Sequence, residues 1–550
     1  MIRNQLRQAV LDAVEQARLD GALPDTPLPE VTLESPANPR MGDFATSLAL
    51  KLRRATNLDP LVVANLIAER LGVSSDVARV EVARPGFINF TLADSWLQDQ
   101  LGVILDAGER YGAVDLGEGR SAQVEYVSAN PTGPLHIGAG RNAALGDALA
   151  NVLAHAGYRV QREYYVNDAG TQTERLTASV MARYRQALGE AAELPTDGYP
   201  GEYVTDLGEQ LAARHGRALL ELPQDDALEA INRETAEIVL EWIRQDLARL
   251  NVRHDTWFSE RSLYTSGLAD QMLNALRERG LVVEREGAVW FTASDVGLEK
   301  DEVLIRSSGK PTYFFSDIAY HYDKLVVRGF DRAIDVWGAD HHGQVPRVTA
   351  AIKALGTDPE RFSVVLYQLV SLIRGGEQVR MGKRAGTYVT LSEVLDDVGA
   401  DAVRFFLVAS SPNAMMKFDL DLARQQSSEN PVHYVKYAHA RAAGVLRNAG
   451  TIDYSTANAR LLTAEAELAL LRMMIRLPEH VESAALNLTP HPLAYYAQEI
   501  AAALNVFYDT CRVISDDLEL TRARLRLVAA CKVVLANTLR LIGVSAPEQM

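Results

Sequence analysis

The apolar positions at the start of the chain repeat with the period of a helix. Charged residues of both signs lie between them, which indicates an amphipathic helix and argues against a signal peptide. The apolar face consists of Ile2, Leu6, Val10, Ala13, Val14 and Ala17. Helical stretches then alternate with short β-rich runs such as residues 83–92, and we expect an α+β domain over residues 1–112.

The pattern changes twice further along the chain. Strand, loop and helix segments alternate over residues 113–415, which is typical of a parallel α/β sheet. Within them, residues from about 171 to 290 are mostly helical and charged and indicate an insertion. Residues 416–550 have helical period almost throughout. We therefore expect an α/β Rossmann-like parallel-sheet domain with a helical insertion, between an α+β N-terminal domain and an all-α C-terminal domain.

Composition narrows the class of protein only slightly. A length of 550 residues agrees with roughly three domains. The net charge of −16 argues against extensive coating by nucleic acid, although a local basic face can still bind RNA. The most apolar stretch, residues 525–544, is interrupted by Arg526, Lys532 and Arg540, so no membrane span is expected. Cys511 and Cys531 lie in apolar patterns, so we expect buried thiols, and without a CxxC pair no structural metal.

A loop suited to phosphates follows the first strand of the α/β region. Residues 121–127 predict that strand, residues 128–135 a tight loop, and His136 the start of a helix. A helix N-terminus offers N–H groups and a positive dipole end to a nucleotide, and Gly138 and Gly140 allow close approach. A histidine here can bind an α-phosphate whose charge rises during attack. The helix stripe is Leu145, Leu149, Val152, Leu153 and Ala156.

This loop alone leaves alternatives open. It could be a Rossmann turn for another cofactor, or simply a turn; a P-loop is excluded because GxxxxGK[ST] does not occur here. A second segment, residues 374–386, predicts a hairpin followed by a basic loop between glycines. Thr390 and Glu393 then form a capping box for the next helix. This second loop could instead be an ordinary solvated charged loop. Two loops suited to phosphates in one α/β domain, however, favour a reaction at a nucleotide phosphate, in which the lysine and arginine side chains of the second loop face the leaving pyrophosphate.

Another candidate segment is residues 337–344, at the end of a later strand. A helix follows with Val348, Ala351, Ile352 and Leu355 on one face, so the segment lies at the carboxyl edge, where α/β sheets bind ligands. The pair His341-His342 suggests a metal, but adjacent histidines in a strand point to opposite faces and chelate poorly. We expect nucleotide or amino-acid contact, with His341 the better candidate.

The two loops resemble the HIGH and KMSKS signatures of class I aminoacyl-tRNA synthetases. The surrounding residues are similar to the arginyl-tRNA synthetase family at 84–90, 130–138, 164–170 and 430–441, in family order along essentially the whole chain. The resemblance implies attachment of L-arginine to tRNA(Arg) with ATP and Mg²⁺, through arginyl-adenylate. It also implies that residues 1–112 recognise the tRNA D-loop, that 113–415 are catalytic and that 416–550 bind the anticodon.

Two departures from the signatures stand out. The second histidine of the first signature is replaced by Ala139, and Asn142, Arg141 or a backbone N–H could supply the missing donor. In the second signature Arg380 replaces a lysine and Gly382 a serine, while the more important Lys383 is kept. An arginine preserves the charge but changes the geometry, so the departures bear on rate more than on reaction.

The resemblance also implies roles for individual residues. Catalysis would involve His136, Lys383 and Arg380, and ATP binding Pro134, His136, Gly138, Gly140, His341, Met381 and Lys383. A guanidinium is always charged and has a planar fork of donors, so its pocket needs carboxylates. Arginine would bind at Glu125, Asn130, Tyr313, Asp317 and His341. Taken alone, an aspartate in the position of Asp317 is more often a helix N-cap than a ligand.

Candidate tRNA contacts lie near both ends of the chain. They are Phe87, Asn89, Tyr434, Lys436 and Arg441. Phe87 offers a stacking surface and Asn89 a partner for a base edge, although Phe87 could instead be a core aromatic. The expected partners are tRNA(Arg), L-arginine and ATP, with no membrane and no DNA, and we expect a cytoplasmic monomer.

Three other functions compete with this one. A synthetase for another amino acid would have no need of two carboxylates at the side chain. A non-catalytic RNA-binding paralogue would explain Ala139 but not the retained Lys383. A nicotinamide-dependent dehydrogenase lacks its GxGxxG with a downstream acidic residue.

Overall fold

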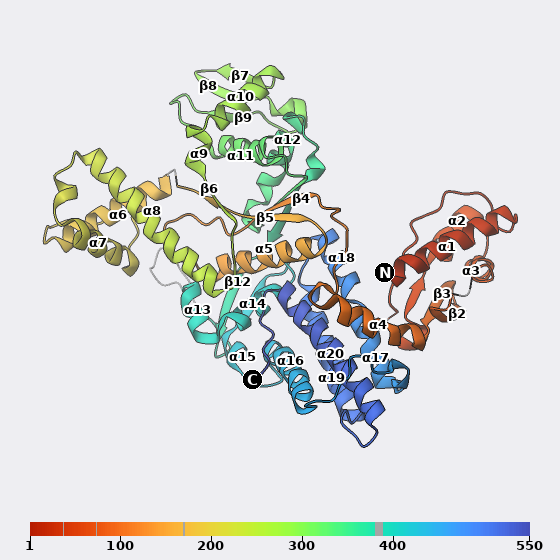
Figure 1. Ribbon diagram of the computed structural model, residues 1–550. Helices are drawn as coiled ribbons and strands as arrows, with labels where there is room; N and C mark the ends of the chain where they lie inside the picture. Colours follow the sequence, from red (N-terminus) through yellow and green to blue (C-terminus); the bar gives the residue numbers. More distant parts are fainter. Residues whose placement is uncertain (37, 73, 169–170, 380–388) are drawn as a thin grey trace.

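The computed structural model describes residues 1–36, 38–72, 74–168, 171–379 and 389–550 (Figure 1). In these ranges a central parallel sheet lies between inserted pieces, a separate N-terminal module and a group of long C-terminal helices (Figure 1). Every helix in those ranges falls short of the length and apolarity that a bilayer crossing demands.

The N-terminal module begins with the predicted amphipathic helix. Helix α1 (Ile2–Leu19) buries all six predicted apolar positions, so that prediction is confirmed. Two further helices pack on a three-stranded antiparallel sheet of order β1-β3-β2. The remaining elements are β1 (Phe44–Thr46), α2 (Leu48–Thr56), α3 (Pro60–Ala68), β2 (Val77–Ala83), β3 (Phe87–Leu92) and α4 (Asp94–Ala107).

The central sheet has five parallel strands in the order β11-β10-β4-β5-β6. They are β4 (Ser121–Glu125), β5 (Arg159–Val166), β6 (Thr256–Ser259), β10 (Arg332–Gly338) and β11 (Phe362–Tyr367). From β4 the chain proceeds to β5 on one side, and the later strands β10 and β11 add on the other. The carboxyl ends of β4 and β10 therefore flank a switch point, the place where such sheets bind ligands.

Helix α5 (Ile137–His155) connects β4 to β5 and is buried on nearly every side. The sheet covers one face, and α14 (Ala400–Ala409) and α18 (Leu477–Asn487) contact it from elsewhere. The predicted stripe along this helix is buried throughout, and so are many positions outside the stripe. The helix start at His136 is thus held in a rigid setting.

The predicted insertion over 171–290 is wrong as a single piece, because β6 lies inside it and forms an edge of the central sheet. A first piece, between β5 and β6, is helical: α6 (Thr171–Ala187), α7 (Glu202–His215) and α8 (Gln224–Arg249). A second piece follows β6 and contains an antiparallel sheet of order β7-β8-β9. Its elements are α9 (Glu260–Thr265), α10 (Leu268–Glu278), β7 (Val282–Arg285), β8 (Ala288–Phe291) and β9 (Glu302–Ile305).

Two helices on the way back to the sheet carry candidate residues. They are α11 (Tyr313–Tyr322), continued by the π-helical turn η5 (Asp323–Val327), and α12 (Val345–Ala354) after β10. The face predicted for the second helix is buried at Val348, Ala351, Ile352 and Leu355.

The hairpin predicted near residue 374 is confirmed, since β12 (Val370–Arg374) pairs with β13 (Glu377–Gln378). It follows β11, the last strand of the central sheet along the chain, and belongs to a separate sheet of order β13-β12-β14. The capping box of Thr390 and Glu393 starts the next helix as predicted. Further elements here are α13 (Leu391–Val398), β14 (Met416–Asp419) and α15 (Leu420–Arg424).

The C-terminal region is helical, as its pattern predicts. Its long helices are α16 (Pro431–Asn448), α17 (Glu465–Met474), α18, α19 (Pro492–Thr510) and α20 (Leu518–Leu541). Cys511 and Cys531 are free, buried thiols, which confirms that prediction.

Candidate active site

Three carboxylates gather at the carboxyl edge of the central sheet. Glu125 ends β4, Glu260 follows β6, and Asp317 lies in α11. Their common neighbour is Tyr165 of β5: burial raises the pKa of its hydroxyl, and Glu260, Asp317 and Glu125 raise it further. Glu125 and Asp317, the two acids predicted from sequence, are therefore brought to one place.

Asp317 lies on the wall of a cavity of about 520 Å³, which Tyr313 and Arg347 also line. Burial raises the pKa of Asp317 to about 6. Within the described part of the chain its carboxylate has no hydrogen bond or ion pair. It is not a helix N-cap, because Thr312 fills that role for α11. A partly buried carboxylate on the wall of a cavity, with its pKa raised, is suited to binding a cation.

Glu260 was not among the residues predicted from sequence. It is 5% exposed, and burial raises its pKa to about 7, with Asp317 and Asp168 adding to the shift. Its place directly after strand β6 could have identified it, because acidic residues at the carboxyl ends of parallel strands are candidate ligands. The helical insertion before β6 concealed that strand.

Glu125 is held on both carboxylate oxygens. The Ser128 hydroxyl donates to Oε1 at 2.9 Å, and the Lys324 ammonium donates to Oε2 at 2.6 Å. Burial raises the pKa of Glu125, and Lys324 opposes that shift. The sequence pattern did not indicate this lysine, which is fully buried.

The turn after β4 has a strained backbone. Val127 has φ of 69° and Ser128 has φ of 41°, values that a β-branched residue in particular rarely adopts. Asn142 stabilises the turn: its Oδ1 accepts from the Val127 N–H at 2.6 Å, and its Nδ2 donates to the Val336 carbonyl at 2.8 Å. One side chain of α5 thus ties together the ends of β4 and β10, beside Glu125.

Asn142 and Arg141 do not replace the missing second histidine. Asn142 is committed to the backbone of both strands, and the buried Arg141 donates to the carbonyls of Gln368, Ala414 and Ser411. Both side chains support the fold around the site.

His136 caps the helix that it precedes. Its Nδ1 accepts a hydrogen bond from the Ala139 N–H at 3.3 Å, which assigns the ring proton to Nε2. A Cβ at Gly138 would come within 2.9 Å of the His136 ring, so glycine is needed for this cap. At Gly140 a Cβ would lie 2.8 Å from Leu391, so that glycine permits helix packing.

The first loop contacts the chain just beyond the second. The Leu391 N–H donates to the Leu135 carbonyl at 2.7 Å, and His136 and Thr390 form an antiparallel bridge. The described chain stops at Val379 and resumes at Val389, so Arg380, Met381 and Lys383 lie outside the described residues. The described residues that follow the second loop, Thr390 and Leu391, lie against the first loop.

The other predicted ligand-binding residues differ in their surroundings. Asn130 donates to Gln172 at 2.7 Å, and Pro134 lies in the same loop, ahead of the helix. Tyr313 is 59% exposed at the start of α11. His341 is half-exposed in the 3-10 turn η6 (Ala339–Gln344), not in a strand as the metal argument assumed.

The predicted RNA contacts lie apart from this site, in the outer domains. Phe87 is half-buried and Asn89 is buried in β3. On α16, Lys436 is paired with Asp401. On the same helix, Arg441 and Tyr434 both contact Asn505 of α19. Arg441 donates to Asn505 at 3.2 Å, and Asn505 donates to the Tyr434 hydroxyl at 2.9 Å.

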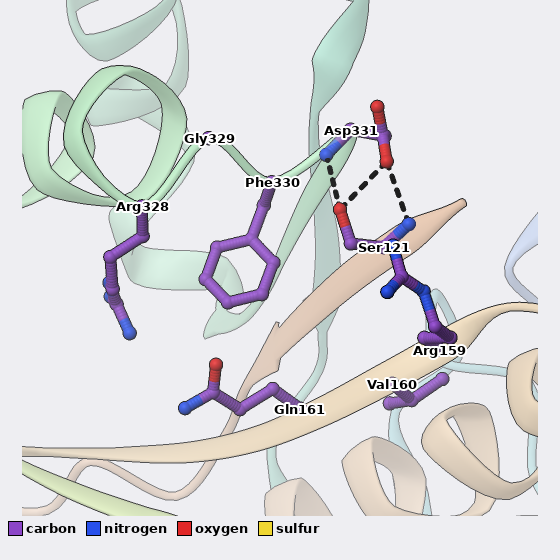
Figure 2. A pocket seen from close by; sticks show the side chains of 8 residues that line it. All are labelled: Ser121, Arg159, Val160, Gln161, Arg328, Gly329, Phe330 and Asp331. Atoms are coloured by element: carbon purple, nitrogen blue, oxygen red, sulfur yellow. Dashed lines mark hydrogen bonds between the residues drawn. The ribbon is translucent and has the colours of Figure 1, made fainter. Parts of the chain in front are cut away.

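A second hollow, of about 580 Å³, lies at the opposite edge of the sheet (Figure 2). There the Asp331 carboxylate accepts from the Ser121 N–H and hydroxyl, each at 2.7 Å (Figure 2). The Arg328 guanidinium in its wall is paired with Glu163 and Asp323. None of the predicted residues lies there, and amino ends of parallel strands are not where such sheets bind ligands.

Comparison with known proteins gives one consistent result along the chain. Family models match for "Arginyl tRNA synthetase N terminal domain" over residues 2–92, "tRNA synthetases class I (R), catalytic domain" over 100–439 and "DALR anticodon binding domain" over 435–550. The arginine–tRNA ligase of Dehalococcoides mccartyi is 47% identical, covering 100% of this chain and 99% of that protein. That of Syntrophotalea carbinolica is 46% identical, with 100% of both covered. The arginyl-tRNA synthetase of Thermus thermophilus superposes with a TM-score of 0.80 at 25% identity, with 100% of both chains covered.

Proposed function

Because the chain belongs to the class I arginyl-tRNA synthetase family and is an arginine–tRNA ligase, we propose that it joins arginine to tRNA(Arg) at the carboxyl edge of its central sheet. The arginine carboxylate attacks the α-phosphate of ATP, which forms arginyl-adenylate and releases pyrophosphate. The terminal ribose hydroxyl of the tRNA then takes the arginyl group and releases AMP. Catalysis of this kind is positioning plus charge stabilisation.

The observation that supports this placement is the group of three acids around Tyr165, namely Glu125, Glu260 and Asp317. Asp317 and Glu125 bind the guanidinium, and Tyr313 adds a hydroxyl at the cavity wall. Asn130 and His341 take the α-amino and carboxylate end, where the first loop and the end of β10 converge. Binding of a cation favours the ionised form of Asp317, whose pKa burial raises, so the pocket prefers guanidinium over neutral side chains.

ATP, with Mg²⁺, enters as substrate at the start of α5. His136 donates from Nε2 to the α-phosphate, while the helix N-terminus, Pro134, Gly138 and Gly140 face the nucleotide. Lys383, with Arg380 and Met381 beside it, closes over the leaving pyrophosphate. The bridge between His136 and Thr390 supports this placement, because it holds the far end of that loop against the first.

The outer domains bind tRNA(Arg). We assign residues 1–112 to the D-loop, through Phe87 and Asn89, residues 113–415 to catalysis, and 416–550 to the anticodon, through Tyr434, Lys436 and Arg441. We further propose that the enzyme acts as a monomer in the cytoplasm.

ATP–pyrophosphate exchange with a panel of amino acids and total tRNA tests the assignment. We expect exchange with arginine alone, and only with tRNA present, as the family generally requires. Exchange with another amino acid, or none under any condition, would overturn it. Lys383→Ala should then slow adenylate formation at least tenfold with arginine affinity intact, and an unchanged rate would remove the second loop from the mechanism.

A further inference from the structure

The fully buried ammonium group of Lys324 lies beside Glu125, at the carboxyl edge of the central sheet. Lys324 donates from Nζ to Glu125 Oε2 at 2.6 Å and to Asp335 Oδ1 at 2.7 Å, and it lies 4.0 Å from the centre of the Tyr320 ring. Replacing a buried ion pair by apolar groups is often neutral or stabilising, so stability alone gives little reason for this lysine. Nor does the proposed chemistry use it directly.

The backbone places Lys324 by means of a local irregularity. Helix α11 carries Asp317 and His321 one turn apart. Lys324 lies in η5, the π-helical turn that continues this helix. His321 and Lys324 thereby both reach Asp335 of β10, and Lys324 also reaches Glu125 of β4. Isolated π-helical turns within α-helices are frequent at functional sites.

His321 completes the group. Its Nδ1 donates to the Asp317 carbonyl at 2.7 Å, and its Nε2 lies 2.9 Å from Asp335 Oδ2. The ring therefore links the Asp317 backbone in α11 to the Asp335 carboxylate in β10. Although burial raises the pKa of Asp335, Lys324 and His321 bring it below the ordinary value, so the ion pair stays charged.

The charges of this group do not balance. When ionised, Glu125, Asp317 and Asp335 carry three negative charges, whereas the Lys324 ammonium, which pairs with Glu125 and Asp335, carries one positive charge. A further cation reduces this excess of negative charge, and the substrate guanidinium is a cation of fixed charge.

We propose that Lys324 is a positioning residue for arginine: with Asp335 and His321 it holds the Glu125 carboxylate in place and opposes the loss of its charge on burial, and it leaves the site with an excess of negative charge. The inference rests on the proposed function, since it presumes that arginine binds at Glu125 and Asp317. Without Lys324, burial favours the neutral acid of Glu125, which attracts a guanidinium no better than a neutral group.

The test uses the full chain with tRNA and compares arginine with citrulline, in which a neutral urea replaces the guanidinium. Lys324→Met should raise the KM for arginine at least tenfold, with the KM for ATP and the inhibition constant of citrulline changed less than twofold. Lys353→Met, on the exposed side of α12, is the matched control and should change none of them. An unchanged arginine KM, or an equal loss for arginine and citrulline, overturns the inference.

Two further variants keep the outcome interpretable. Asp335→Asn retains the size of the side chain and removes one negative charge, so it should raise the arginine KM at least threefold even if Lys324→Met does not fold; an unchanged KM again overturns the inference. Asp317→Asn tests the proposed function itself. If it leaves the arginine KM unchanged, the pocket is misplaced; if it raises that KM while Lys324→Met does not, only the role of Lys324 fails.

Discussion

The ring Nδ1 of His136 accepts a hydrogen bond from the backbone N–H of Ala139 at 3.3 Å. The same side chain therefore caps α5 and keeps its ring proton on Nε2. Ala139 occupies the position of the second signature histidine, so the backbone there serves the first histidine instead of a phosphate. The cap and the phosphate contact of His136 can be separated by mutation.

We predict that His136→Asn and His136→Ala will differ in stability but not in chemistry. Both remove the Nε2 donor and should slow adenylate formation at least tenfold. Asparagine is a good N-cap and should keep the stability, whereas alanine should lose about 1 kcal/mol. ATP–pyrophosphate exchange with tRNA, alongside urea unfolding, measures both effects. If the asparagine variant retains the wild-type rate, His136 is a cap only.

Arginine binding should strengthen as the pH rises through about 6. Burial raises the pKa of Asp317 to about 6, so below that pH the acid is neutral and each further pH unit should cost up to about tenfold in affinity. Glu260, with a pKa of about 7, titrates beside it and extends the rise. Calorimetric titration with arginine between pH 5 and 8 measures the profile. In Asp317→Asn the step near 6 should disappear, and its persistence would assign it to another group.

The same carboxylate should destabilise the protein when no substrate is bound. Because the folded-state pKa of Asp317 lies above its ordinary value, the folded chain binds the proton more tightly, and stability falls as pH rises through about 6. Asp317→Asn should therefore raise the free energy of unfolding at pH 7.5 by about 1 kcal/mol or more and leave it unchanged at pH 4. Urea unfolding at both values checks this. A loss of stability at pH 7.5 would mean that the ionised carboxylate has a favourable partner.

Sequence pattern predicted the local features well. The six buried positions of α1, the capping box at Thr390 and the buried cysteines all depend on neighbouring residues, and all are confirmed. Features that depend on distant partners were not predictable. Glu260 was missed because two insertions conceal β6, and Lys324 because its inward direction depends on a π-helical turn. Lys436 resembled an exposed base, yet it pairs with Asp401 from another helix.

One buried arginine joins parts of the chain that are far apart in sequence. Arg404 of α14 is paired with Asp147 of α5, and it donates to the carbonyls of Ile542 at 2.7 Å and Leu250 at 3.0 Å. Ile542 directly follows α20, and Leu250 directly follows the last helix of the first inserted piece. Asp147 lies in α5, the helix that begins after His136. A Cβ at Gly543 would overlap the Arg404 guanidinium, so the glycine is required by this contact.

We predict that Arg404→Met will cost about 3–5 kcal/mol of stability, because it leaves the Asp147 carboxylate buried without its main partner and removes donors from several carbonyls. Adding Asp147→Leu should recover part of the loss, since the unpaired charge is then removed as well. Arg447→Met, at an exposed ion pair with Glu548, is the matched control and should cost less than about 1 kcal/mol. Urea unfolding of the wild type, Arg404→Met, Asp147→Leu and the double variant measures the coupling between Arg404 and Asp147. Strictly additive losses would show that the arginine acts through its carbonyl contacts alone, and that α5 is not tied to the C-terminal helices through this charge pair.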